Sequence, residues 1–284
     1  MNAYKNTAGK IKLIAFDLDG TALHREKGLT DFTRRVLEKA SERQVVLAPA
    51  TGRAWTALPE SLAAMDAVRY FITSNGSSVF KKTGSRDTAK RIYGRDMRKE
   101  QVLQMLNIAG DYSWPLEVFI EGQAYARQDY VMNPVGFGAS SAVYVQSTRI
   151  PVKDIRRFVW ENVDKIEGLN IVVADMAEKA EIRKRLEAMP DSYVTSSVPR
   201  YLEVGAGGIC KASALAFLTE YLGITKEETA AFGDGENDIE MLKYAGIGIA
   251  MENAADQTKA AAKQIAGTCN EDGMAKMICR LLDL

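Results

Sequence analysis

IKLIAFDLDGT, from Ile11 to Thr21, joins a short apolar run directly to a pair of carboxylates. An apolar run of this length, without alternation, is typical of a strand buried on both faces of a parallel sheet. VVLAPA (Val45 to Ala50) and YFIT (Tyr70 to Thr73) are runs of the same kind. Between the first two, LTDFTRRVLEKASERQ repeats its apolar residues with helical spacing after a capping Thr or Asp. The pattern predicts a strand, a helix and a strand.

The same alternation returns near the C-terminus. KASALAFLTEYLGI predicts a helix that ends at Gly223, TAAFG a strand, DIEMLKYAG another helix and IGIAM another strand. Strands that alternate with helices favour an open sheet of parallel strands. We therefore expect a Rossmann-like α/β core.

The middle of the chain has a different pattern. LEVFIEGQAYARQ reads as two strands joined through Glu121 and Gly122, and AEKAEIRKRLEAM reads as a helix followed by a short β-rich piece. This indicates an α+β domain inserted into the core. We expect the core at 1–86 and 201–284 and the insert at 87–200.

Length and charge restrict the class of partner. The chain has 284 residues, a length that suits a core with a sizeable insert. Its 37 Lys and Arg residues balance its 37 Asp and Glu residues, and no basic block lies along the chain. The positive field that nucleic-acid binders need is therefore missing, so a small-molecule partner is expected. We expect a monomer or a small homo-oligomer.

The compartment is predicted from the cysteines and the apolar stretches. Cys210, Cys269 and Cys279 are odd in number and lack metal-ligand spacing, which suits free thiols in a reducing compartment. MNAYKNTAGK has no apolar region of the kind a secretory signal requires. The uncharged stretch from Tyr130 to Thr148 contains Asn, Pro, Gly and a Ser pair that would make a poor membrane helix. A cytoplasmic protein without membrane contact is expected.

Asp17 and Asp19 follow the first predicted strand, and ligands of open α/β sheets bind at the carboxyl ends of strands. Two carboxylates on one loop can meet one substrate, where one attacks phosphorus and the other transfers a proton. Gly20 gives the backbone freedom to turn, and Thr21 adds a hydroxyl. By itself the motif also fits an ordinary turn or a calcium loop.

A second group of carboxylates follows the TAAFG strand in GDGENDIEML, where Asp234 and Asp238 stand four positions apart. Magnesium prefers hard oxygen ligands, and carboxylates from two loops can supply them. Clustered carboxylates raise one another's pKa unless a metal or a lysine offsets their charge. Lys211 is a candidate for that lysine, since it opens the helix before the strand. The alternative is an exposed lysine of a first helical turn.

Two further strand tips carry polar residues. Thr51 follows the second strand in ATGR, where a hydroxyl and backbone amides can hold phosphate oxygens. Arg53 is close enough in sequence to reach phosphate or substrate, although a surface arginine is the alternative. Asn75 follows YFIT and is either a site residue or part of a turn. His24 is the only histidine in the sequence, so a catalytic triad based on histidine is not expected.

These motifs together resemble the haloacid dehalogenase superfamily, in particular its Cof-type sugar-phosphatase branch (subfamily IIB). The matching motifs are FDLDGT, ATGR, SNG, LEVGAGGICKASAL and GDGENDIEML, in family order from Phe16 to Leu242. AGIGIAMENAAD and NEDGMAKMI also look like the family, although Glu252 stands where glycine is common. The resemblance implies a parallel-sheet core with an inserted cap of type C2B.

The resemblance also implies the roles of the residues. Asp17 would be the nucleophile and a magnesium ligand, and Asp19 the general acid/base that lends its backbone carbonyl to the metal. Asp234 would be a further ligand, and Asp238 either a ligand or a residue that positions water or Lys211. The residues expected to hold phosphate or substrate are Leu18, Thr51, Gly52, Arg53, Asn75, Lys211 and Asn237.

The implied function is that of a Mg²⁺-dependent phosphatase for small phosphorylated metabolites, with sugar phosphates as the default and phosphorylated cofactors as an option. It would act through an aspartyl phosphate, with fixed donors offsetting charge in the transition state. The alternatives are a phosphomutase or phosphotransferase of the same fold, or a non-catalytic regulator that binds a phosphometabolite. Dehalogenation is disfavoured because it needs neither Asp19 nor the metal-binding pair.

Specificity is expected to lie in the insert, because the core motifs fix only the reaction class. The insert would act as a lid over the site. Gly122 to Pro134 mixes aromatic, cationic and amide groups suited to a polar ligand, with Arg127 as its cation. The alternative is that Tyr125 and Tyr130 are packing residues of the insert.

Overall fold

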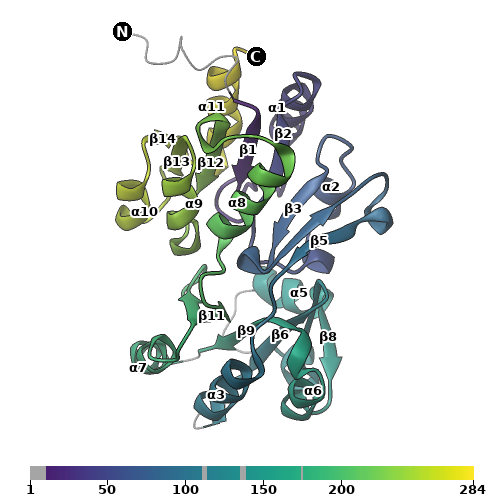
Figure 1. Ribbon diagram of the computed structural model, residues 1–284, viewed down its shortest axis with the longest axis vertical. Coiled ribbons are helices and arrows are strands. Elements are labelled where there is room, and N and C mark those ends of the chain that lie inside the picture. The colour runs from purple at the N-terminus through teal and green to yellow at the C-terminus, as the bar shows by residue number, and fades with distance from the viewer. Residues whose placement is uncertain (1–10, 111–113, 135–138, 174) are drawn as a thin grey trace. The chain divides into compact units, whose positions relative to one another are not determined.

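A computed structural model describes residues 11–110, 114–134, 139–173 and 175–284 (Figure 1). The chain divides into two compact units. The first, the core, comprises Met1–Thr51, Pro59–Tyr93 and Cys210–Leu284. The second, the insert, comprises Gly94–Ile209 together with the short segment Gly52–Leu58.

Five parallel strands form the main sheet of the core, in the order β14-β13-β12-β1-β2. The central strand β1 is completely buried, as expected for a strand covered on both faces. This confirms the prediction of a parallel α/β core. The strands are β1 (Leu13–Phe16), β2 (Val46–Pro49), β12 (Thr229–Gly233), β13 (Ile247–Met251) and β14 (Gln264–Ala266).

YFIT forms β3 (Tyr70–Thr73), but it pairs differently from the other early strands. It lies antiparallel to β4 (Ser78–Lys81) in a small sheet whose third strand is β5 (Lys90–Gly94). A single parallel bridge between Ala50 and Ile72 joins it to the end of β2. The expectation that YFIT is an ordinary strand of the parallel sheet is therefore wrong, because apolar composition does not specify the direction of the partner.

Two helices of the core have a terminus that the sequence predicts. Thr30 accepts a hydrogen bond from the amide of Thr33 at the start of α1 (Asp31–Glu42), and Gly223 ends α8 (Lys211–Leu222) in the left-handed conformation. α1 packs against α11, and α8 against α9. The remaining helices of the core are α2 (Glu60–Ala63), α9 (Ile239–Tyr244), α10 (Asp256–Ala261) and α11 (Gly273–Leu282).

The insert is built on a six-stranded sheet in the order β10-β11-β9-β6-β7-β8. Its first two strands form the predicted hairpin, whose turn residues Glu121 and Gly122 both have positive φ. The strands are β6 (Leu116–Ile120), β7 (Gln123–Arg127), β8 (Arg149–Val152), β9 (Ile166–Val172), β10 (Ser192–Thr195) and β11 (Tyr201–Ala206). Its helices are α3 (Lys99–Gly110), α4 (Gln128–Met132), α5 (Ala139–Thr148), α6 (Ile155–Glu161) and α7 (Met176–Glu187).

The boundaries of the insert differ from those predicted at residues 87 and 200. Residues up to Tyr93 belong to the core, because β5 completes the small sheet and Ile92 and Tyr93 pack on the core cluster. At the other end β11 pairs with β9 and β10 and so belongs to the insert. Gly52–Leu58 joins the insert because Ala54 and Ala57 pack against Phe119 and Ala124.

The described residues contain no helix with the length and apolar character needed to cross a membrane. In the uncharged stretch Tyr130 to Thr148, residues 135–138 lie outside the described part, as does MNAYKNTAGK at the start of the chain. The three cysteines are free, in agreement with the expectation from their number and spacing.

Candidate active site

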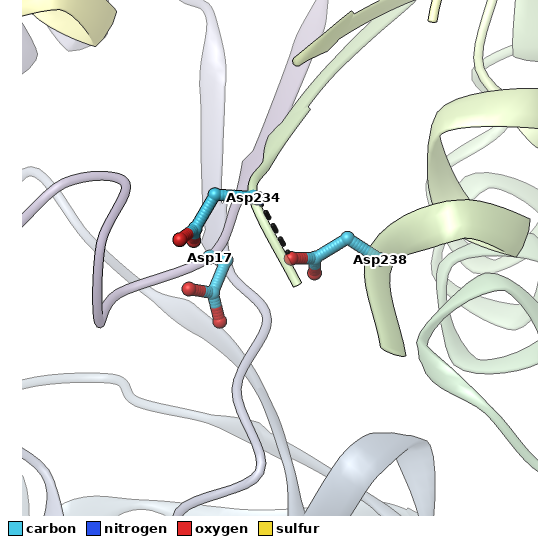
Figure 2. A group of neighbouring side chains, drawn as sticks. All are labelled: Asp17, Asp234 and Asp238. Carbon is cyan, nitrogen blue, oxygen red and sulfur yellow. Dashed lines mark hydrogen bonds between the residues drawn. The ribbon is translucent and has the colours of Figure 1, made fainter. Parts of the chain in front are cut away.

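Three carboxylates meet at the carboxyl edge of the main sheet of the core (Figure 2). Asp17 directly follows β1 and Asp234 directly follows β12, and these two strands are parallel neighbours. Asp238 ends the short turn Glu236–Asp238 that comes next. Each of the three offers an oxygen within 4.8 Å of the others. The strand tips therefore bring together carboxylates that lie more than 200 positions apart in the sequence.

Lys211 lies between two of these carboxylates. Its Nζ is 2.6 Å from Asp17 Oδ1 and 2.7 Å from Asp238 Oδ1, and its side chain is fully buried. The SNG turn packs on the start of its helix, where a Cβ on Gly76 would lie 2.1 Å from the carbonyl oxygen of Cys210. Lys211 is thus a buried counter-ion rather than an exposed lysine of a first helical turn.

Both oxygens of Asp238 already accept hydrogen bonds. Oδ2 accepts from the backbone amide of Asp234 at 3.0 Å (Figure 2). It also accepts from the amide of Gly235 at 2.9 Å, while Oδ1 accepts from Lys211. A carboxylate engaged in this way fixes the loop that carries Asp234 and orients Lys211. Of the two predicted roles for Asp238, this geometry favours positioning over direct ligation.

Asp234 is held from two sides. The Thr21 hydroxyl donates to its Oδ1 at 2.9 Å, and the Asn253 amide donates to its Oδ2 at 3.2 Å. Gly20 packs so closely that a Cβ there would lie 2.2 Å from Oδ2, and its φ is +86°. Only glycine meets both conditions at this position without strain.

Burial shifts the pKa values of the cluster. It raises the pKa of Asp17, an effect that Lys211 partly offsets and that Asp238, Asp234 and Asp19 reinforce. Burial together with the charge of Asp238 raises the pKa of Asp234 to about 6, against the hydrogen bond from Thr21 and the charge of Lys211. Burial lowers the pKa of Lys211, but attraction to Asp17 and Asp238 outweighs it, so this pKa lies above its ordinary value.

The raised pKa of Asp234 predicts how the stability of the metal-free protein depends on pH. The folded chain binds a proton on Asp234 more tightly than the unfolded chain does. The stability that this proton contributes is therefore complete below about pH 4 and is lost as pH rises through about 6. In excess chelator, the free energy of unfolding of the wild type relative to Asp234→Asn should therefore fall by on the order of 2 kcal/mol between pH 4 and 7. Urea unfolding at several pH values measures this difference, and a constant or rising difference would contradict it.

Asp19 and Leu18 occupy the loop after Asp17. Asp19 is exposed to solvent, and its carboxylate is not one of the three that cluster. Leu18 is buried, and its carbonyl oxygen accepts hydrogen bonds from the amides of Thr21, Ala22 and Leu23. This turn directs the loop back toward the sheet.

Thr51 and Arg53 belong to different units. Thr51 is buried in the core, where its amide donates to Ile72 and its carbonyl accepts from Asn75. Gly52 and Arg53 belong to the insert. There the Arg53 guanidinium donates to the carbonyl of Ala57 at 3.1 Å and lies 4.5 Å from the ring centre of Tyr144. The structure therefore gives Arg53 partners within the insert.

Asn75 and Asn237 are brought together from two strand tips. The Asn237 amide donates to Asn75 Oδ1 at 2.9 Å. Ser74 and Asn75 both have positive φ, at 50° and 53°, a conformation that is costly for non-glycine residues. The turn is held in this conformation next to the carboxylates, which is typical of functional loops.

Asn253 is a further residue of the site, and it is not among the site residues predicted from the sequence. Asn253 contacts Asp234 and lies in AMENAAD, a motif that resembles the family. β13 ends at Met251, so Asn253 also stands just beyond a strand tip. The rule that selected Asp17 and Asp234 would have selected it too.

The segment Gly122 to Pro134 has mixed surroundings. Tyr130 is buried and donates to Glu117, while Tyr125 stacks on Phe158 with ring centres 4.7 Å apart. Both tyrosines are therefore packing residues. Arg127 is exposed, pairs with Asp129 and lines a cavity of about 330 Å³ within the insert.

The oxygen donors of the cluster fit a hard divalent cation. In the part of the chain that the structure describes, the group consists of three carboxylates, and Lys211 pairs with two of them. Oxygen donors of this type suit Mg²⁺, which usually retains several waters. Asp17 and Asp234 are the residues whose carboxylates would hold it.

Comparison with known proteins agrees with this geometry. A family model described as haloacid dehalogenase-like hydrolase matches residues 14–278. The chain is 33% identical over 270 residues to the 5-amino-6-(5-phospho-D-ribitylamino)uracil phosphatase YcsE of Bacillus subtilis (strain 168), covering 94% of each chain. It is 30% identical over 276 residues to the HMP-PP phosphatase of Cronobacter sakazakii, covering 96% of each.

Solved structures show the same fold. A haloacid dehalogenase-like hydrolase from Bacteroides thetaiotaomicron superposes with a TM-score of 0.78 at 26% identity, covering 95% of this chain and 99% of that one. The subclass IIB sugar phosphatase BT4131 superposes with a TM-score of 0.76 at 24% identity, covering 94% and 97%. The likeness extends over nearly the whole chain.

Proposed function

Since the chain belongs to the haloacid dehalogenase-like hydrolase family and is a phosphatase of small phosphorylated compounds, we propose that it is Mg²⁺-dependent and works through an aspartyl phosphate on Asp17. The observation that carries this proposal is the position of Asp17. Its carboxylate lies at the tip of the central strand, beside a second carboxylate that can share a cation and against a buried ammonium group.

The reaction has two steps. A carboxylate oxygen of Asp17 attacks phosphorus, the bond to the ester oxygen breaks, and Asp19 gives its proton to the leaving alcohol. Asp19 then takes a proton from water, the water oxygen attacks the same phosphorus, and the bond to Asp17 breaks to release inorganic phosphate. The exposed side chain of Asp19 supports its role as the group that exchanges protons with solvent.

Fixed hydrogen-bond donors, of which Lys211 is also positively charged, would offset the charge of the transferring phosphoryl group. Lys211 is oriented by Asp238, and the Asn237 amide is oriented by Asn75. We assign both, with Thr51 and the amide of Gly52, to the phosphoryl oxygens. A bound Mg²⁺ would supply the remaining positive charge, held by Asp17, Asp234 and the backbone carbonyl of Asp19.

The sheet of the insert carries a row of polar side chains that contribute to its own packing. Glu117 and Glu203 each stand in register with Asn170 from opposite sides, so the three side chains share one face of the sheet. The carboxylates of Glu117 and Glu203 are buried and have partners within the insert: Glu117 pairs with Arg149 and accepts from the hydroxyls of Tyr130 and Tyr201, and Glu203 accepts from the amide of Ser197.

We propose that the insert is a lid that recognises the part of the phosphate ester beyond the phosphate. Sugar phosphates and phosphorylated vitamin precursors are the proposed substrates, and relatives are named for HMP-PP and a ribitylaminouracil phosphate.

The metal requirement is the first test of the proposal. The purified protein should release phosphate from members of a panel of sugar phosphates and phosphorylated pyrimidines in Mg²⁺. Excess chelator should reduce the rate by roughly 10³-fold or more, because the carboxylates then repel an anionic substrate. Restoring Mg²⁺ should restore the rate, and Mn²⁺ should substitute for it. Undiminished turnover in chelator would exclude the metal from the mechanism.

The same assay separates the alternatives. A phosphomutase or phosphotransferase would consume the ester but release almost no free phosphate without an acceptor. A regulator that only binds the metabolite would release none under any condition. Stoichiometric release of free phosphate and alcohol supports the hydrolase.

A further inference from the structure

The side chain of Asn253 makes three hydrogen bonds in the site. Its Nδ2 donates to the carbonyl oxygen of Gly20 at 2.8 Å and to Asp234 Oδ2 at 3.2 Å. Its Oδ1 accepts from the backbone amide of Cys269 at 2.9 Å. One side chain therefore links the loop after β1, the loop after β12 and the loop that precedes α11.

An asparagine is required by the chemistry of these partners. The carbonyl of Gly20 and the carboxylate of Asp234 only accept hydrogen bonds, whereas the amide of Cys269 only donates. A primary amide offers two donor hydrogens and an acceptor oxygen in one plane. Aspartate lacks the donors, and serine or alanine cannot span three loops.

We infer that Asn253 is a positioning residue for the cation site, which acts by fixing the carboxylate of Asp234 relative to the loop that carries Asp17. Thr21 orients one oxygen of Asp234 and Asn253 orients the other, so the plane of the carboxylate is fixed. The hydrogen bond from Asn253 to the carbonyl of Gly20 holds the loop after Asp17 close to Asp234, where Gly20 packs against the Asp234 carboxylate. This inference rests on the proposed function, because it assumes that Asp234 holds the cation.

The test is the affinity for Mn²⁺, measured directly by electron paramagnetic resonance on wild type, Asn253→Ala and Asn253→Leu. Loss of a side chain that orients a metal ligand typically weakens metal affinity 10- to 100-fold. We therefore expect the Kd for Mn²⁺ to rise by about tenfold or more in both variants. The Mg²⁺ concentration for half-maximal activity should rise in parallel, while KM for the phosphate ester at saturating Mg²⁺ changes little.

Asn270→Ala is the matched control. Asn270 lies in the same loop as Cys269, is exposed and accepts a hydrogen bond from the amide of Arg25 instead of contacting Asp234. It should bind Mn²⁺ as the wild type does. Asn253→Leu keeps the volume of the side chain but cannot donate, so it reports on the hydrogen bonds if Asn253→Ala loses its fold.

The outcomes separate this inference from the proposed function. If the wild type binds no Mn²⁺, the metal-dependent function itself fails. If the wild type binds Mn²⁺ and the folded variants bind it equally well, Asn253 has only a structural role and the inference is overturned, even if their Tm is lower. A raised Kd in both variants with an unchanged Kd in Asn270→Ala supports it.

Discussion

Asp17→Asn should release no measurable phosphate, with kcat reduced roughly 10⁴-fold or more, as expected when a covalent nucleophile is removed. An amide nitrogen or oxygen cannot form the acyl phosphate, although the asparagine oxygen can still accept the hydrogen bond from Lys211. The protein should remain folded, and in chelator its Tm should equal or exceed that of the wild type, because one buried negative charge is gone. Phosphate release and thermal unfolding measure the two halves of this result.

Asp19→Asn is the comparison that identifies the step. It keeps the nucleophile but lacks the acid, so an aryl phosphate with a good leaving group should still phosphorylate Asp17. The phosphoenzyme should then accumulate, detectable by mass spectrometry, because the base for its hydrolysis is missing. Appreciable turnover by Asp17→Asn would rule out covalent catalysis through this residue.

Lys211→Met should impair both activity and stability. The ammonium group is fully buried and lies within hydrogen-bonding distance of Asp17 and Asp238, so its removal leaves buried carboxylates without their counter-ion. Breaking a buried ion pair in this way typically costs about 3–5 kcal/mol. Urea unfolding in chelator should show a loss of this order, and kcat should fall at least about 10²-fold. Added Mg²⁺ should recover part of the stability but not the activity.

Lys82→Met is the matched control within the same unit. Lys82 is also buried, but it donates to the carbonyl oxygens of Ala63 and Met65, both at 2.8 Å, rather than to carboxylates. Its replacement should lower the free energy of unfolding without a specific loss of kcat in the folded protein. Equal losses of kcat in the two variants would show that the effect of Lys211→Met is general rather than specific to the site.

The carboxylate cluster was predictable because a single geometric rule produces it. Parallel strands end at one edge of the sheet, so polar residues that follow apolar runs converge there whatever their separation in sequence. Asp17, Asp234, Asp238 and Lys211 all follow from this rule and from the need to balance charge. Asn253 follows from it as well, and was missed because an asparagine in a small-residue motif resembles a turn.

Other features depended on information that apolar patterns do not contain. The direction of the partner of β3 is set by the SNG turn, which reverses the chain into β4. The insert ends at Ile209 because β11 extends its sheet, although the strand continues directly into the motif that contains Lys211. Such assignments depend on tertiary pairing, which overrides local preference.

The short segment Gly52–Leu58 has a consequence for building chimeras of this protein. Thr56 hydrogen-bonds to the carbonyl of Gly122, and Ala54 and Ala57 lie against Phe119 and Ala124. A graft that exchanges only Gly94–Ile209 for the corresponding domain of a relative would leave these alanines facing a foreign surface. A graft that also carries Gly52–Leu58 transfers the complete packing unit. The unit to exchange is therefore a discontinuous pair of segments. A chimera that lacks the shorter segment would have poor packing around Ala54 and Ala57.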